Sequence, residues 1–239
     1  MSLFTARAAL FDMDGTLIDT EPIYYEAYRL AIESTGVAYS PEFHVEHLLG
    51  RPEKVGSEAC VNLLSLSITA SELLRLRDEH VEPAFALALP CAGAEAVVTS
   101  LSGALPANRM AIATSSKLRL VEIKRRSGRV DKLLNTFGEA IVCSDSPSMI
   151  GRKGKPSPDI FLTAAAALGV SARECIAFED SLAGIQAAAA AGCFVIAIPD
   201  SRLPEGAALK AGANIVLLSL EDFTLDLVGL GKGKIEGDV

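Results

Sequence analysis

The sequence predicts an α/β protein with a doubly wound, mostly parallel sheet and an inserted all-helical cap domain. Three observations support this prediction: short apolar runs without polar alternation, helix patterns between those runs, and one long stretch with helix patterns and no strand. The chain has 239 residues, which is enough for one large domain with a smaller insertion.

Six apolar runs are predicted to form buried strands because each is short and is followed by a helix pattern or a turn. They are residues 8–11, 110–113, 140–143, 175–178, 194–198 and 215–218. The predicted helices between them are residues 94–101, 117–126, 158–168, 182–191 and 205–211. Gly192 directly follows the fourth of these helices and is expected to end it.

Residues 18–90 interrupt this alternation, because they show helix signals and no convincing strand. The signals lie in "TEPIYYEAYRLAIESTG", "SPEFHVEHLLG" and "TASELLRLRDEHV". We therefore expect a Rossmann-like core of residues 1–17 and 91–230, a helical cap of residues 18–90 and a flexible tail of residues 231–239. The connections around residues 17–20 and 89–93 are expected to act as hinges for the cap.

Composition excludes several classes of function. The net charge of −8 argues against a broad nucleic-acid surface, which needs clustered Lys and Arg. Five scattered cysteines without a C-x-x-C pair predict reduced thiols. The apolar segments are too short for a signal peptide or a bilayer span. We expect a cytoplasmic monomer without nucleic-acid or membrane partners.

The first candidate site is "DMDGT", in which Asp12 and Asp14 follow the first predicted strand. Residues two apart in an extended segment point to the same side, so the two carboxylates are expected to converge. Two like charges leave water only with a compensating cation, a proton or hydrogen-bond donors. The pattern therefore predicts a cation there, while a plain Asp-Gly turn remains the alternative.

Three more polar groups follow predicted strands or open predicted helices. Thr114 and Ser115 lie in "ATSSK", Lys155 in "GKPSPDIF", and Glu179 and Asp180 in "FEDSLAGIQAA". Taken singly, they read as helix caps, a solvated lysine and helix-dipole partners. Together they would meet at one sheet edge and supply the donors, cation and metal ligands that phosphoryl transfer requires.

These four motifs, in this order, resemble the haloacid dehalogenase-like hydrolase superfamily, in its branch with a helical cap. The resemblance extends from residue 9 to about residue 230. The stretches "IATSSK", "FEDSLAGI", "IPDSRLP" and "SLEDF" are most similar to pseudouridine-5′-phosphatases, with sugar-phosphate phosphatases and β-phosphoglucomutases as near relatives. The resemblance implies a Mg²⁺-dependent phosphatase that hydrolyses a small phosphomonoester, a sugar phosphate or a nucleotide-like ester, through an aspartyl-phosphate.

The resemblance also implies roles for the two carboxylates of the first motif. Asp12 would be the nucleophile and a metal ligand. Asp14 would protonate the leaving alcohol, deprotonate the attacking water and bind the metal through its backbone carbonyl. We expect Mg²⁺ and Lys155 to keep Asp12 ionised, and a proton on Asp14 to relieve the remaining repulsion.

The remaining motif positions receive their roles in the same way. The Thr114 hydroxyl and the Ser115 N–H would contact the phosphoryl oxygens. Lys155 would offset charge between nucleophile and phosphate. Asp180 would be a direct Mg²⁺ ligand, and Glu179 an acidic neighbour that acts through water.

Two other functions are considered. A β-phosphoglucomutase-type phosphomutase is the first, but those enzymes place a histidine near the position of Tyr24. The second is a catalytically silent phosphate-binding regulatory module, which is disfavoured because every motif position is filled. Dehalogenation is disfavoured because that branch does not need the carboxylate of Asp14.

The roles of three residues of the predicted cap are not decided by the sequence. Arg51, in the Gly-Arg-Pro turn of "LLGRPEK", is either a substrate-selecting side chain or part of a surface turn. His44 and His47 are one helical turn apart, a spacing that can bind metal. Because no third ligand is evident, a packed or solvated pair is the preferred interpretation.

Overall fold

The computed structural model describes residues 4–48, 53–126 and 128–231, and it contains the predicted α/β sheet. The order of the six strands is β5-β4-β1-β6-β7-β8, and every neighbouring pair is parallel. The strands are β1 (Ala8–Phe11), β4 (Met110–Ala113), β5 (Ile141–Val142), β6 (Cys175–Glu179), β7 (Phe194–Ala197) and β8 (Ile215–Val216). Each lies within a predicted apolar run, apart from the last residue of β6, so the strand predictions are confirmed.

The central strand β1 is the point at which the strand order reverses. From β1 the chain passes to β4 and β5 on one side and later to β6, β7 and β8 on the other. In this register Phe11, the last residue of β1, is opposite both Ile112 and Phe178. The carboxyl ends of three strands therefore meet at the position where open α/β sheets bind their ligands.

The sheet is covered on both faces, because alternate residues of β1 belong to two different cores. Ala9 and Phe11 pack into one apolar cluster together with side chains of the helices α5 (Ala94–Ala104) and α7 (Asp131–Asn135). Ala8 and Leu10 pack into a second cluster with side chains of the helices α8 (Asp159–Ala167) and α9 (Leu182–Ala191). Strands buried on both faces lose the polar alternation of a half-exposed strand, which explains the continuous apolar runs of the sequence.

The helices of the sheet domain lie close to their predicted ranges. They are α5 (Ala94–Ala104), α6 (Leu118–Arg125), α7 (Asp131–Asn135), α8 (Asp159–Ala167), α9 (Leu182–Ala191) and α10 (Ala207–Ala211). Helix α7 was not predicted, since five residues are too few to show a helical period. Gly192 ends α9 with a φ of 88°, as expected for a residue in the left-handed region.

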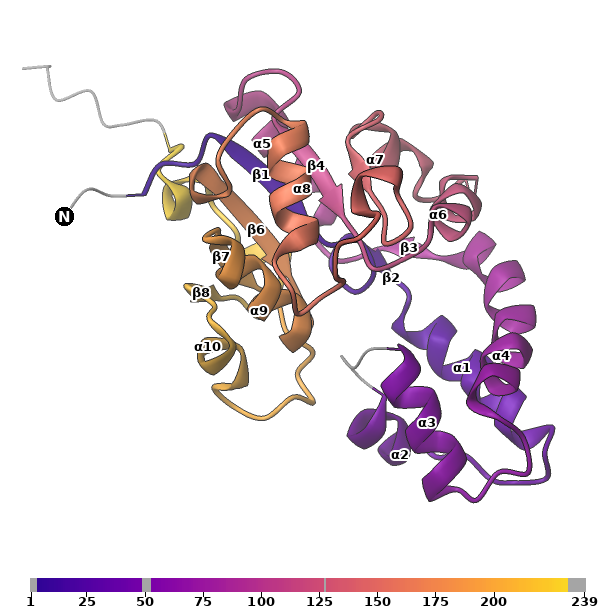
Figure 1. The fold of residues 1–239 in the computed structure, drawn as a ribbon. Helices are drawn as coiled ribbons and strands as arrows, with labels where there is room; N and C mark the ends of the chain where they lie inside the picture. Colours follow the sequence, from indigo (N-terminus) through magenta and orange to yellow (C-terminus); the bar gives the residue numbers. More distant parts are fainter. Residues whose placement is uncertain (1–3, 49–52, 127, 232–239) are drawn as a thin grey trace, which may run out of the picture.

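A helical insertion leaves the sheet domain after β1 and returns before α5 (Figure 1). We use this name for α1 (Glu21–Glu33), α2 (Pro41–His47), α3 (Glu53–Leu63), α4 (Ala70–Ala84) and the 3₁₀ turn η1 (Phe85–Leu87). Two short strands, β2 (Ile18–Asp19) and β3 (Leu89–Pro90), pair antiparallel where the chain enters and leaves it. The expectation of no strand in this region is therefore wrong at both ends, because two-residue strands carry no periodic signal.

The helical insertion has an apolar core of its own. Tyr28 and Ile32 of α1, Cys60 of α3 and Leu73 of α4 are buried together in one cluster. The Thr69 hydroxyl accepts a hydrogen bond from the Glu72 N–H and so caps the start of α4. This separate core supports the predicted division into core and cap, whose exact limits stay a prediction. Of the predicted flexible tail, residues 232–239 lie outside the described part.

The five cysteines are free thiols, and four of them are buried. The prediction that they form no disulfide framework is confirmed. In the described part of the chain, every helix is too short or too polar to cross a lipid bilayer.

Candidate active site

The four sequence motifs meet at one edge of the sheet. Asp12 directly follows β1, Thr114 follows β4, and Glu179 is the last residue of β6. Lys155 comes from the loop before α8 and reaches both Asp12 and Glu179 with its ammonium group. The parallel order of β4, β1 and β6 explains this assembly, because it places their carboxyl ends side by side.

The Lys155 ammonium lies between two buried carboxylates. It donates hydrogen bonds to Asp12 Oδ1 and, over 2.5 Å, to Glu179 Oε1. Burial opposes the charge of Lys155, but the two carboxylates outweigh burial and raise its pKa. Burial also raises the pKa of Asp12 to about 7, an effect that the charges of Glu179 and Asp14 increase and that of Lys155 opposes. Lys155 alone does not compensate these acids.

Glu179 is fixed by donors from the start of α9. Its Oε2 accepts from the N–H groups of Asp180, at 3.1 Å, and Ser181, at 3.0 Å. The Ser181 hydroxyl donates to the same oxygen over 3.1 Å. Its other oxygen faces Lys155, so the carboxylate is satisfied on both sides and held in one orientation.

Asp12, Glu179 and Asp180 form a cluster that can hold a metal ion, and we call it the carboxylate cluster. One oxygen from each lies within 4.8 Å of the others. Burial, followed by the charges of Glu179 and Asp12, raises the pKa of Asp180 well above its ordinary value. Three acids against one lysine leave an excess of negative charge, and oxygen donors suit a hard divalent cation such as Mg²⁺.

The first motif is folded tightly against this cluster. Gly15 has a φ of +84°, and a Cβ at this position would lie 2.3 Å from Asp180 Oδ2. The Thr16 hydroxyl donates to Asp180 Oδ1 over 3.1 Å. The Gly-Thr pair of "DGT" therefore allows the turn to approach Asp180 and orients its carboxylate.

Asp14 has a partner that was not predicted. Lys124 of α6 donates to Asp14 Oδ1 over 2.5 Å, and Ser116 donates to Oδ2 over 2.7 Å. Burial disfavours the charge of Asp14, but Lys124 and these hydrogen bonds outweigh it and lower the pKa of Asp14. These contacts favour the carboxylate form of Asp14, whereas the sequence-based expectation was a proton that relieves its repulsion with Asp12.

The carboxylates of Asp12 and Asp14 therefore have separate cationic partners, Lys155 and Lys124. The expectation that the two carboxylates converge on one cation assumed an extended backbone. In the structure β1 ends at Phe11, and the chain turns through Gly15 back to pair with Ile18. Both carboxylates line one cavity, as expected, but a different lysine pairs with each.

Thr114 and Ser115 lie at the end of β4. The Thr114 side chain is buried, and its hydroxyl accepts from the Ser116 N–H over 3.0 Å. Ser115 is exposed and lines the same cavity as Thr114. Neither residue caps α6, because Asp145 Oδ1 accepts from the Leu118 N–H at 2.8 Å. The plain helix-cap interpretation of these hydroxyls is therefore wrong.

A cavity of about 710 Å³ lies between the sheet edge and the helical insertion. Asp12, Asp14, Thr114, Ser115, Lys155 and Asp180 line it from the sheet side. Tyr24, Tyr28, Glu53 and Arg77 line it from the insertion. Six of the predicted site residues, all except Glu179 and Arg51, therefore line one cavity.

Arg77 is a buried cation on the insertion side of this cavity. Its guanidinium carbon lies 5.7 Å from the ring centre of Tyr24 and 5.3 Å from that of Tyr28. Its Nη2 pairs with Glu53 Oε1 at 2.5 Å, and it also pairs with Asp78. Arg77 therefore holds the rings of Tyr24 and Tyr28 in place at the wall of the cavity that Asp14 also lines.

His44 is a packed residue, as preferred from the sequence. One ring nitrogen lies 2.7 Å from the Tyr39 hydroxyl, and the other lies 2.8 Å from Glu21 Oε1. The ring is buried, and both nitrogens are used within the protein. Arg51, the other open residue of the predicted cap, lies outside the described residues.

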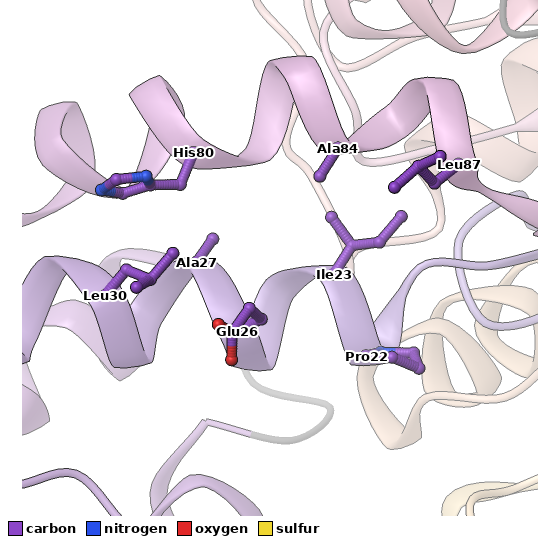
Figure 2. Close-up of a pocket in the computed structure, with 8 residues that line it drawn as sticks. All are labelled: Pro22, Ile23, Glu26, Ala27, Leu30, His80, Ala84 and Leu87. Carbon is purple, nitrogen blue, oxygen red and sulfur yellow. The ribbon is translucent and has the colours of Figure 1, made fainter.

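A second depression of about 300 Å³ lies on the helical insertion, between α1 and α4 (Figure 2). Ile23, Ala27 and Leu30 of α1 face Ala84 of α4 and the neighbouring Leu87 across it. The residues described as lining it include none of the predicted site residues. It is therefore separate from the chemistry at the sheet edge.

Sequence analysis missed Lys124, Ser116 and Arg77 as site residues. Lys124 carried a signal, because it lies three residues after Val121 and four after Leu120, on the apolar face of α6. A lysine at such a position needs a buried partner. Arg77 has the same signature, since it lies four residues after Leu73 and four before Val81.

Comparison with known proteins agrees with this geometry. Residues 6–192 match the family described as haloacid dehalogenase-like hydrolase. A probable pseudouridine-5′-phosphatase of Drosophila melanogaster is 34% identical over 225 residues, which cover 92% of this chain and 93% of that protein. A phosphorylated carbohydrates phosphatase of Thermotoga maritima is 31% identical over 218 residues, covering 90% and 95%.

Solved structures show the same fold. The crystal structure of CbbY from Rhodobacter sphaeroides in complex with phosphate has a TM-score of 0.75 and 25% identity to this chain. The match covers 94% of this chain and 99% of CbbY. On the family match, the related phosphatases and the site, the chain belongs to the haloacid dehalogenase-like hydrolases and is a phosphatase of that family.

Proposed function

We propose that the protein is a Mg²⁺-dependent phosphatase that hydrolyses a small phosphomonoester through an aspartyl-phosphate on Asp12. One observation carries this proposal. Asp12 lies at the cavity wall, is held by Lys155 and belongs to the carboxylate cluster. A nucleophile, a lysine and metal ligands thus meet where a phosphoryl group has room to bind.

The reaction has two steps. In the first, an oxygen of Asp12 attacks phosphorus, the bond from phosphorus to the ester oxygen breaks, and the protonated form of Asp14 gives its proton to the leaving oxygen and becomes a carboxylate. In the second, the carboxylate of Asp14 takes a proton from water, the water oxygen attacks phosphorus, and the bond from phosphorus to the Asp12 oxygen breaks. Inorganic phosphate leaves, Asp12 is again a free carboxylate, and Asp14 is again protonated. The lowered pKa of Asp14 favours the carboxylate form that the second step requires.

The other residues position and stabilise the phosphoryl group. Thr114 and Ser115 line the cavity, and the Thr114 hydroxyl and the Ser115 N–H would donate to the phosphoryl oxygens. Asp12 and Asp180 would hold the Mg²⁺, with the Asp14 carbonyl as a further ligand and Glu179 close by. The bound cation would offset the negative charge of the phosphoryl group and of its attacking carboxylate.

We propose a sugar phosphate or a nucleotide-like ester, such as pseudouridine 5′-phosphate, as the substrate. Two relatives named above are described as acting on pseudouridine 5′-phosphate or on phosphorylated carbohydrates. The cavity also offers the rings of Tyr24 and Tyr28 and the carboxylate of Glu53 beyond Asp14. Aromatic rings and carboxylates suit a leaving group that carries hydroxyls or a base.

We further propose that the helical insertion acts as a cap over this cavity. The β2 and β3 pair brings the two chain connections together, and it lies within the residues 17–20 and 89–93 that we expect to act as hinges. Closure would exclude water and strengthen the electrostatic action of Lys155 and Mg²⁺. A cytoplasmic location, a monomeric state and the lack of nucleic-acid or membrane partners stay predictions.

A phosphate-release screen tests the proposal. Purified protein is assayed with Mg²⁺ on sugar phosphates, nucleotides and pseudouridine 5′-phosphate, with Asp12→Asn as the inactive control. We expect turnover of at least one ester by the wild type and none by the variant. Failure of every ester in the presence of Mg²⁺ would favour the silent phosphate-binding module instead. Isomer formation from a hexose 1-phosphate, without phosphate release, would favour a phosphomutase.

A further inference from the structure

Lys124 is a buried lysine that has no role in the two proposed reaction steps. Its side chain has no exposed surface, and it lies on α6, which begins after the Thr114 loop. Its ammonium group donates to Asp14 Oδ1 over 2.5 Å and to Ser116 Oγ over 3.1 Å. Ser116 in turn donates to Asp14 Oδ2. Lys124 and Ser116 therefore hold both oxygens of one carboxylate.

The opposite side of Lys124 faces the helical insertion. Its Nζ lies 4.5 Å from the ring centre of Phe85, in η1, where the insertion returns to the sheet domain. Phe85 is fully buried and packs edge-on against Tyr24 of α1, at 6.0 Å between ring centres. Lys124 thus lies between Asp14 and the two segments that lead into and out of the insertion.

We propose that Lys124 is a positioning residue for proton transfer, which fixes the Asp14 carboxylate beside the leaving oxygen. The proposal rests on the proposed phosphatase function. It requires that Lys124 stay charged and unreacted, while Asp14 alone gives and takes the proton. Phe85 packs on Lys124, so Lys124 also belongs to the junction between the sheet domain and the helical insertion.

A purely structural role would not require a charge at this position. Burying an ammonium group costs free energy, and an apolar side chain of similar length would fill the space beside Phe85 without that cost. Among the described residues, Asp14 is the acid with which Lys124 pairs, and the Asp14 side chain is 21% exposed. The charge is therefore explained by what it does to Asp14.

Proton donation to the leaving oxygen gives the proposal a specific kinetic signature. An alkoxide leaving group needs a proton in the transition state, whereas p-nitrophenolate leaves readily without one. General acid catalysis is worth about 100- to 10,000-fold, and its contribution grows as the leaving group becomes poorer. Loss of Asp14 positioning should therefore harm alkyl esters more than p-nitrophenyl phosphate.

The experiment compares the full-length wild type with Lys124→Met on p-nitrophenyl phosphate and on the sugar phosphate that the wild type hydrolyses fastest. The measured quantity is kcat/KM, because it covers the steps up to leaving-group departure and omits the later hydrolysis of the aspartyl-phosphate. The matched control is Lys132→Met, which makes the same change at an exposed lysine of α7.

We expect Lys124→Met to reduce kcat/KM on the sugar phosphate at least about tenfold more than on p-nitrophenyl phosphate. Lys132→Met should leave both values within about twofold of the wild type. Equal losses on the two esters in Lys124→Met, or no loss on either, would overturn the proposal. A wild type that hydrolyses neither ester would instead refute the proposed function, so the two failures are distinguishable.

Thermal unfolding followed by circular dichroism shows whether Lys124→Met is folded. Should it not fold, Lys124→Gln replaces it, because glutamine keeps hydrogen-bond donors while removing the charge. The same unequal loss on the two esters is expected for the glutamine variant. Equal losses in that variant would overturn the proposal in the same way.

Discussion

Gly184 of α9 lies directly against the carboxylate of Glu179. A Cβ at Gly184 would be 1.7 Å from Glu179 Oε1, the oxygen that accepts from Lys155. The glycine of "DSLAGI" is therefore needed for space: α9 starts so close behind β6 that only a residue without a side chain fits beneath the carboxylate cluster.

Gly184→Ala should displace Glu179 and Lys155 and so disturb the partner of Asp12. We expect a loss of kcat of more than about tenfold, together with a fall of about 1–3 kcal/mol in the free energy of unfolding from overpacking. Gly103→Ala in α5 is the matched control, since a Cβ there meets nothing within 4 Å. That variant should gain up to about 1 kcal/mol through helix propensity and keep its activity. Equal behaviour of the two variants would contradict the steric argument.

Asp12→Asn should abolish turnover while the protein stays folded. The amide keeps the shape of the side chain, but its oxygen is a far weaker nucleophile than a carboxylate. Steady-state kinetics should show a residual kcat below about one thousandth of the wild-type value. Thermal unfolding should show a transition as cooperative as that of the wild type. A substantial residual kcat would remove Asp12 from the role of nucleophile.

Asp180→Ala should weaken metal binding. Removing one of three clustered carboxylates takes away a ligand and part of the charge that attracts the cation. Half-maximal activity should then require at least about tenfold more Mg²⁺.

The same variant has a second readout that does not depend on activity. Free Mg²⁺ at about 100 times its Kd should stabilise the folded wild type by about 2.7 kcal/mol, measured as a rise in Tm. Asp180→Ala should lose most of this rise at that Mg²⁺ concentration, whereas Glu205→Ala, at an exposed acid of the sheet domain, should keep it. An unchanged Mg²⁺ response in Asp180→Ala would place the metal elsewhere.

Arg77→Met should change the preference among substrates. Arg77 orders Tyr24 and Tyr28 on the side of the cavity that would receive the leaving group. We expect the ratio of kcat/KM for two good substrates to change by at least about fivefold, while the Mg²⁺ requirement stays as in the wild type.

Arg75→Met is the control for this change, because Arg75 lies on the same helix but is exposed and pairs with Glu72 and Glu79. It should leave the ratio unchanged. An unaltered ratio in Arg77→Met would show that Arg77 only supports the structure. The same ratio, measured in Arg51→Ala, tests the substrate-selecting role predicted for Arg51.

The sequence predicted the sheet and its functional edge well, for a physical reason. A strand buried on both faces must be apolar at every position, so runs such as "AALF" and "MAIA" are visible without any structure. Polar residues at the ends of such runs, Asp12 and Thr114 among them, necessarily lie at the edge. The two-residue strands β2 and β3 and the five-residue helix α7 escaped prediction because they are too short for a period to repeat.

What the sequence alone determined is which chemical groups are present and that they lie at one edge: Asp12, Lys155, Glu179 and Asp180 follow from strand ends and helix starts. What only the tertiary structure decided is how the charges pair. Asp12 and Asp14 are two residues apart, yet Lys155 and Lys124, separated from them by more than a hundred residues, give each its own partner. Pairing depends on the direction of each side chain after the strand has ended, and that direction is set by the turn at Gly15 and by the packing of α6, which no local pattern encodes.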